Sequence, residues 1–108
     1  MAIYELRTYT LYVGKMGKQL SFTAKRVLAC FGKRWFRQKV SGLLHSDVGT
    51  INQLVHLWRF DNDADRRNHW ATLFSDGPFM AFGAKIRPLL MTQEVKVMLE
   101  APLGGPHP

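Results

Sequence analysis

The stretch NQLVHLWRF, residues 52–60, decides the fold because its side chains alternate with the two-residue period of a β-strand. Large apolar residues occur in both alternating sets, so both faces of the sheet to which this strand belongs should be covered. One set also holds a histidine, and the surroundings of that imidazole become the main functional question. The first set is Asn52, Leu54, His56, Trp58 and Phe60, and the second is Gln53, Val55, Leu57 and Arg59.

Three further segments resemble strands: residues 3–12, the weaker 40–49, and 91–99. The short gap between 40–49 and residues 50–60 predicts a hairpin. A helical pattern follows residue 15 and is interrupted near Gly32. A second helix begins after Asn62, whose spacing to Asp65 resembles a capping box. Residues 75–78 break that helix, and a further helical segment ends at Pro88.

The resulting order is strand, helix, strand, strand, helix, strand, which is the ferredoxin-like βαββαβ pattern. It predicts an α+β protomer with a four-stranded antiparallel sheet and helices on one face. With 108 residues, 46% of them hydrophobic, the chain is expected to form a single domain over residues 1–100. Residues 101–108, rich in proline and glycine, are expected to form a loose tail.

Targeting signals, cysteine content and charge bear on where the protein acts and on what it could bind. The N-terminus lacks the apolar core of a secretory signal, and no run of residues is long and apolar enough to span a membrane. Cys30 is the one cysteine, which fits a reducing cytoplasm. The net charge of +7 is concentrated between Val13 and Ser46, which contain eight of the 15 Lys and Arg residues and no acid. This basic helix is read first as a solvated face and second as a surface for anionic partners.

Covering both faces of the sheet requires a partner. We assign Val55 and Leu57 to the helix-covered face, which leaves Leu54, Trp58 and Phe60 on the other. A second copy is the simplest cover, because two-fold homodimers are the commonest oligomers. Two sheets packed face to face would form a closed barrel, and His56 would point into its interior. Parity allows three residues of the first strand to face the same interior: Glu5, Arg7 and Tyr9.

Three segments, YELRTYTL (4–11), NQLVHLWRFDN (52–62) and KIRPLLMTQE (85–94), are similar to motifs of the NIPSNAP family. The resemblance covers about residues 3–99 and departs from the family at residues 76–79. It implies a homodimeric α+β barrel with a ferredoxin-like protomer, and it implies no defined reaction. Members of the wider superfamily include cofactor-free monooxygenases, haem-degrading enzymes and binding proteins, and fold alone does not choose among them.

His56 is the candidate catalytic residue, since a neutral imidazole near an apolar wall can act as a base. The plainer interpretation is a histidine satisfied by polar neighbours in the core. The candidate ligand-binding residues are Glu5, Arg7, Tyr9, Trp58, Arg59, Arg87 and Gln93. An Arg7–Glu5 ion pair is favoured over a ligand contact, and Trp58 is read first as a packing residue. Arg59 and Arg87 enter through the family resemblance, although Arg59 has the opposite parity to His56.

No metal site is expected, because the four histidines and Cys30 lack the spacing of known ligand motifs, and no feature requires a cofactor. Three functions therefore stay open. The first is a homodimer that binds a small organic molecule near His56, with cofactor-free oxygenase or isomerase activity. The second is a non-catalytic binding or adaptor module. The third is an anionic-surface binder using the basic helix, although neither nucleic acid nor a membrane surface is the favoured partner.

Overall fold

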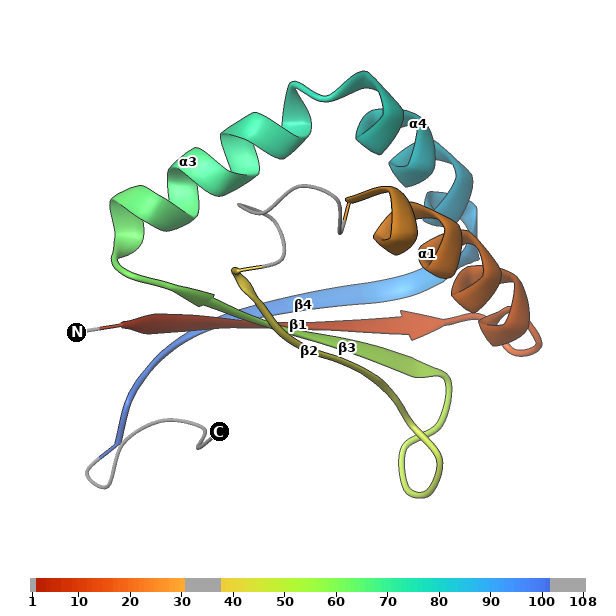
Figure 1. The fold of residues 1–108 in the computed structure, drawn as a ribbon. Helices are drawn as coiled ribbons and strands as arrows, with labels where there is room; N and C mark the ends of the chain where they lie inside the picture. The colour runs from red at the N-terminus through yellow and green to blue at the C-terminus, as the bar shows by residue number, and fades with distance from the viewer. Residues whose placement is uncertain (1, 31–37, 102–108) are drawn as a thin grey trace.

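A computed structural model describes residues 2–30 and 38–101, with the side chains of residues 26–30 left aside. The interruption expected at Gly32 and the tail beyond residue 101 lie outside these residues. All helices in the described part lie on one side of a four-stranded sheet (Figure 1), which confirms the predicted α+β, ferredoxin-like protomer. The elements are β1 (Ile3–Leu11), α1 (Met16–Cys30), β2 (Val40–His45), β3 (Gln53–Phe60), α3 (Asp63–Phe74), α4 (Gly77–Ile86), the short 3-10 helix η1 (Arg87–Leu89) and β4 (Leu90–Leu99).

The sheet has the strand order β2-β3-β1-β4, and all pairs are antiparallel. The register sets which side chains share a face, because residues opposite each other on paired strands point the same way. Trp58 lies opposite Glu5, and His56 lies opposite Arg7. On the other side of β1, Arg7 lies opposite Val95 of β4. The predicted sharing of one face by Glu5, Arg7, Tyr9 and His56 is therefore confirmed.

The face that these residues share is the helix-covered one, so our assignment of the two faces was wrong. Trp58 and Phe60 are buried against Trp70 and Leu73 of α3, and Leu54 is buried with Leu11 and Leu89. His56 therefore points under the helices and not into a barrel shared between two sheets. The physical reason is that the largest apolar side chains fill the space between sheet and helix. The polar residues of β1 are tolerated there because α3 contributes a partner for them.

Side-chain caps set the start of the two α-helices after β3, α3 and α4, as the sequence predicted for the first of them. The Asn62 side chain accepts a hydrogen bond from the Asp65 backbone N–H at 2.8 Å, and the Asp65 carboxylate accepts one from the Asp61 N–H at 2.9 Å. Asp76 caps α4 in the same way through the Phe79 N–H at 3.0 Å. These caps orient α3 so that Trp70 and Leu73 meet the sheet.

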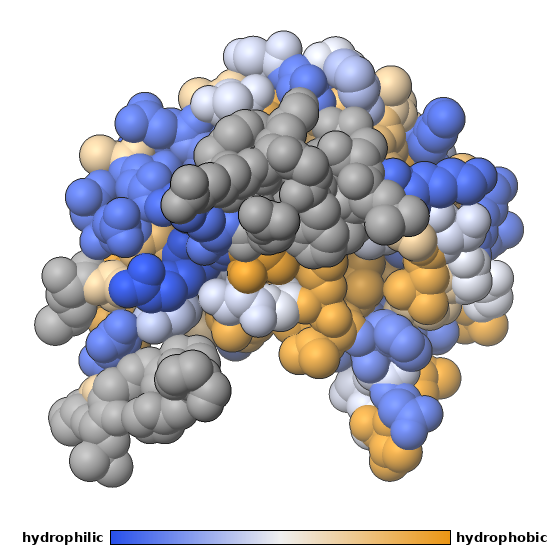
Figure 2. Space-filling view, viewed as in Figure 1, coloured by the Kyte–Doolittle hydropathy of each residue, from blue (hydrophilic) through white to orange (hydrophobic). Residues whose placement is uncertain are grey.

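The uncovered face of the sheet is also apolar. It carries half-buried Leu6, Val55 and Leu57, and the more exposed Leu44 and Met98. Hydrophobic side chains gather beneath the helices and over the sheet in Figure 2, where the outline is hollowed beside the β2–β3 hairpin. Val55 and Leu57, which we had expected under the helices, thus belong to the face that no helix of the described chain covers.

Candidate functional site

The best-developed polar arrangement lies between the sheet and α3, and we call it the Glu5 cluster: Glu5, Arg7, Tyr9, His56 and Arg66. Its centre is the Glu5 carboxylate, which is 0% exposed. That carboxylate accepts hydrogen bonds from Arg7 Nε at 2.7 Å and from Arg66 Nη1 at 3.1 Å. A buried carboxylate is stable only when it is paired, and here two guanidinium groups pair with it.

Arg7 is held by contacts on several sides. Besides the Glu5 contact, its Nη1 donates to the Tyr9 hydroxyl at 3.3 Å, and its guanidinium carbon lies 4.0 Å from the centre of a Trp70 ring. Burial would lower the pKa of Arg7, but the interactions with Tyr9 and Glu5 outweigh it and raise that pKa. The side chain keeps 15% exposure, and within the described residues Nη2 makes no hydrogen bond. Arg7 therefore has donors left for a ligand.

His56 lies directly across from Arg7 on β3. Its ring centroid lies 5.0 Å from that of Tyr9 and 6.3 Å from that of Trp58. Both ring nitrogens are buried, and neither has a hydrogen-bond partner in the part of the chain described. Burial, with a smaller contribution from the Arg7 charge, lowers the pKa of His56 to about 4. The imidazole is therefore neutral at physiological pH, with one nitrogen able to accept a proton.

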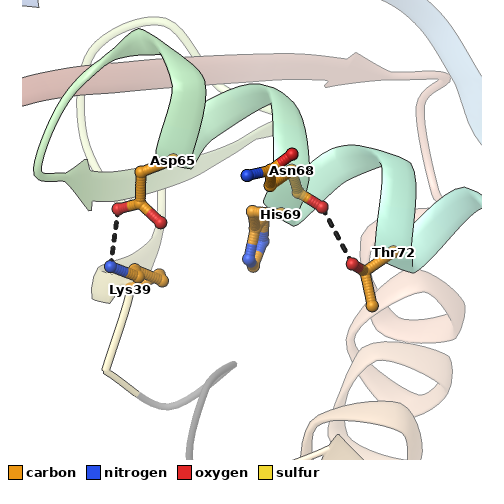
Figure 3. A pocket seen from close by; sticks show the side chains of 5 residues that line it. All are labelled: Lys39, Asp65, Asn68, His69 and Thr72. Carbon is orange, nitrogen blue, oxygen red and sulfur yellow. Dashed lines mark hydrogen bonds and ion pairs between the residues drawn. The ribbon is translucent and has the colours of Figure 1, made fainter.

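A pocket of about 330 Å³ lies on the side of α3 that faces the residues just before β2 (Figure 3). Lys39, which precedes β2, forms an ion pair with Asp65 at 2.6 Å across its rim. The Thr72 hydroxyl donates to the backbone carbonyl of Asn68 at 2.9 Å, and the His69 ring lies between the two ends of the pocket. The pocket is therefore lined by an ammonium, a carboxylate, an amide, an imidazole and a hydroxyl group, and His56 is not among its lining residues.

His69 joins this pocket to the aromatic core. Its ring centroid lies 4.9 Å from that of Trp58 and 4.8 Å from that of Trp70. Burial lowers the pKa of His69 to about 4, and the carboxylates of Asp65 and Glu5 oppose that shift. His69 is therefore a second buried imidazole that is neutral at physiological pH.

The remaining predicted site residues do not gather in one place. Trp58 is a core residue beside the Glu5 cluster, as its plainer interpretation held. Arg59 is exposed on the opposite face, where it lies 3.5 Å from Asp61. Arg87 is exposed where α4 ends and η1 begins, and no contact joins it to the Glu5 cluster among the described residues. Gln93 lies opposite Tyr9 on β4, so it borders the cluster.

Sequence reasoning did not place Arg66 or Trp70 in the candidate site, and it did not predict the pocket on α3. A signal for the pocket was present, because Asp65, Asn68, His69 and Thr72 recur at the three- and four-residue spacing of one helix face. Of the basic helix, Lys15, Lys18 and Lys25 are exposed, and the side chains of Arg26, Lys33, Arg34 and Arg37 lie outside those described. Among residues 2–30 and 38–101, no three His, Cys, Asp or Glu side chains gather to hold a metal ion.

No helix of the described chain is long and apolar enough to cross a membrane.

Comparison with known proteins gives a consistent family signal. A family model described as NIPSNAP matches residues 4–103. A "Protein NipSnap homolog" of Dictyostelium discoideum is 34% identical over 65 residues, a match that spans 59% of this chain and only 27% of that protein.

Two solved structures extend the likeness over nearly the whole chain. A NIPSNAP-like domain protein from Burkholderia xenovorans, called uncharacterized, is 27% identical with a TM-score of 0.86, over 99% of this chain and 91% of that one. A nipsnap family protein with unknown function from Agrobacterium tumefaciens is 30% identical with a TM-score of 0.79, over 90% and 86% of the two chains.

Proposed function

Since the chain belongs to the NIPSNAP family, whose solved members include one of unknown function, we propose that it is a homodimer that binds a small organic molecule at the Glu5 cluster. In this proposal His56 acts as a base on the bound molecule, and Arg7 holds a polar group of that molecule. The cofactor-free oxygenase or isomerase activity expected from the sequence would begin with such a proton transfer.

One observation carries the proposal, and it is the state of the His56 ring. Leaving a buried polar atom without a partner costs about 1–3 kcal/mol. Both nitrogens of His56 are in that state among the described residues. A ligand that hydrogen-bonds the ring would remove that penalty, which supports a binding role for this histidine.

The chemistry follows from the two neighbouring groups. A neutral imidazole has a nitrogen lone pair at physiological pH, and in this proposal it removes a proton from a carbon next to a carbonyl group. Burial and Arg7 lower the pKa of His56, so the anion of the ligand must stabilise the imidazolium that forms beside it. The electron pair left behind moves onto the carbonyl oxygen, and Arg7 Nη2 can donate a hydrogen bond to the resulting anion. In a compound with a β,γ double bond, the anion extends to the γ-carbon; returning the proton there moves the double bond into conjugation with the carbonyl group and completes an isomerisation without a cofactor.

The homodimer is proposed from the open face of the sheet. Leu6, Leu44, Val55 and Leu57 form an apolar surface that the described helices do not cover. A surface of this kind usually marks a protein contact, and two-fold pairing would bury it on both copies at once. We therefore propose that the second copy covers Val55 and Leu57, and not Leu54, Trp58 and Phe60 as the sequence had suggested; His56 lies inside each protomer.

A thermal-shift screen of small carbonyl compounds tests the proposal, using the wild type, His56→Gln and His45→Gln. His45 is the matched control because it is an exposed histidine on the neighbouring strand β2. We expect compounds that stabilise the wild type and His45→Gln but not His56→Gln. Proton exchange from solvent deuterium into the bound compound, followed by NMR, should also require His56. A screen without any His56-dependent compound would refute the proposal.

The second candidate is a non-catalytic binding module, and the position of the pocket favours it. The pocket on α3 is lined by Lys39, Asp65 and their neighbours and does not reach His56. A module of this kind would bind ligands that depend on Lys39 and not on His56. Lys39→Gln therefore separates the two candidates in the same screen.

A further inference from the structure

We infer that the ligand held at the Glu5 cluster is an amphipathic carboxylate, whose apolar tail lies along the β4 strip: Gln93, Val95, Val97 and Leu99. This inference rests on the proposed function and adds the chemical class of the ligand. Three properties of the described residues support it: the exposure of the strip, the charge beside it, and the order of polar and apolar groups along it.

The β4 strip lies on the helix-covered side of the sheet, yet it remains open. Register places Val95 beside Arg7, Val97 beside Glu5 and Leu99 beside Ile3, so all three point toward the side that carries the helices. They are nevertheless 43%, 51% and 67% exposed. Because β4 is the last strand of the sheet, the strip is an apolar surface along an edge.

The charge next to this surface is positive. Arg7 and Arg66 share the single buried carboxylate of Glu5 at 2.7 and 3.1 Å, and Arg66 also contacts Asp63 at 3.0 Å, so the two guanidinium groups carry the partly exposed charge of the cluster. Glu5 is fully buried, whereas Arg7 and Arg66 keep 15% and 21% exposure of their side chains. A ligand that approaches along the strip therefore meets guanidinium groups first. An anion is attracted there, and a cation is repelled.

Polar and apolar groups follow one another along the strip in the order that an amphipathic molecule needs. Gln93, beside Tyr9, and Arg7, beside Val95, supply donors at one end. Val97 and Leu99 supply apolar side chains toward the other end, and the four residue-to-residue steps of strand from Val95 to Leu99 span about 14 Å. A carboxylate at Arg7 Nη2 with a medium-chain alkyl tail over Val97 and Leu99 matches this order.

The aromatic side chains of α3 extend the apolar surface above Arg7. Trp70 lies over the Arg7 guanidinium, and its ring stacks with that of Phe74 at a centroid distance of 6.2 Å. Phe74 is exposed, although it continues the aromatic contacts of the core. A tail that leaves the Arg7 site thus has apolar neighbours on the helix as well as on the strand.

Dodecanoate, kept below its micelle-forming concentration, tests this inference on the full chain by calorimetry and by tryptophan fluorescence. Dodecanol has the same tail without the charge, and acetate has the charge without the tail. We expect dodecanoate to bind saturably at one site per protomer and the other two to bind roughly tenfold more weakly or worse. Equal binding of dodecanol and dodecanoate would overturn the assignment of a carboxylate.

A pair of charge-matched variants locates the site. Val97→Glu places an anion in the β4 strip, and Val48→Glu places the same charge on the hairpin tip, where Val48 is 90% exposed. Val97→Glu should weaken dodecanoate binding roughly tenfold, and Val48→Glu should leave it within about twofold. Equal weakening by both variants would show non-specific attraction to a basic protein and would overturn the inference. A change in oligomeric mass with Val97→Glu would show that a second copy covers the strip, with the same consequence.

The design separates this inference from the proposed function. If dodecanoate fails to bind while the screen yields His56-dependent compounds, only the ligand class is wrong. If neither dodecanoate nor any compound binds in a His56-dependent way, the proposed function fails as well.

Discussion

Mild acid should destabilise the protein through His56 and His69. Both imidazoles have a pKa near 4 in the folded chain, against about 6.5 when unfolded. Below the unfolded value, the unfolded chain binds protons that the folded chain excludes, so folding stability falls as the pH falls from about 6.5 toward 4. The sign is that of a group whose pKa is lowered by folding: its contribution to stability is complete above about pH 6.5 and is lost progressively as the pH falls to about 4.

The size of the effect follows from these values. Between about pH 7.5 and pH 5, each histidine should remove about 2 kcal/mol from the free energy of unfolding, and the two together about 4 kcal/mol. The carboxylates Asp63 and Asp65 have lowered pKa values and protonate only in stronger acid. The window above pH 5 therefore isolates the histidines.

Urea unfolding followed by tryptophan fluorescence, at one protein concentration, measures this loss. His56→Leu should halve the difference in the free energy of unfolding between the two pH values, whatever it does to stability at either pH. His45→Leu removes an exposed histidine and should leave the difference unchanged. A stability that is flat over this range, or a slope that His56→Leu does not reduce, would refute the reasoning.

Three further predictions concern the fold and the interface. Glu5→Gln leaves two arginines without their buried carboxylate and should lower the free energy of unfolding by roughly 3–5 kcal/mol in urea titrations. The control, Glu94→Gln, removes an exposed ion pair and should change that free energy by less than about 1 kcal/mol. Similar losses for the two variants would contradict the burial of Glu5. Asn62→Ala removes the cap of α3 and should cost about 1 kcal/mol by the same assay, and no loss would mean that the cap contributes nothing. Leu57→Glu on the open face should convert the proposed dimer to a monomer in light scattering, while Val48→Glu should not. A wild type that is already monomeric would rule out the proposed homodimer.

The elements could be predicted from the sequence because each depends on local signals. Alternation gave the strands, and the Asn62–Asp65 spacing gave the start of α3 with its hydrogen bond. The four-stranded antiparallel sheet with helices on one face followed from the order of the elements, since a split βαβ pattern has few topologies. The resemblance to the NIPSNAP family pointed to the same fold from independent motifs.

The face that the helices cover could not be read from β3 alone. Alternation separates Trp58 from Leu57, but both sets are apolar, and parity does not say which one meets a helix. The deciding side chains lie on α3: Trp70 fills the space over the sheet, and Arg66 pairs with Glu5 from 61 residues away in sequence. Polar residues on β1 were therefore wrongly excluded from the core, because their partner was not visible in the strand.

The pocket on α3 had a partial signal. Its helical residues share one face by spacing, but Lys39 reaches Asp65 from a segment 26 residues earlier. Only the paired strands β2 and β3 bring that lysine to the start of α3. Contacts of this kind depend on topology, and no local pattern contains them.

A crystal structure of the protein with a compound from the thermal-shift screen tests most directly whether the imidazole under α3 is kept for a ligand. We predict a polar atom of the compound within hydrogen-bond distance of a His56 ring nitrogen, and a second within that distance of Arg7 Nη2. A compound bound only between Lys39 and Thr72, without a contact to the His56 ring, would contradict the claim that His56 belongs to a ligand site.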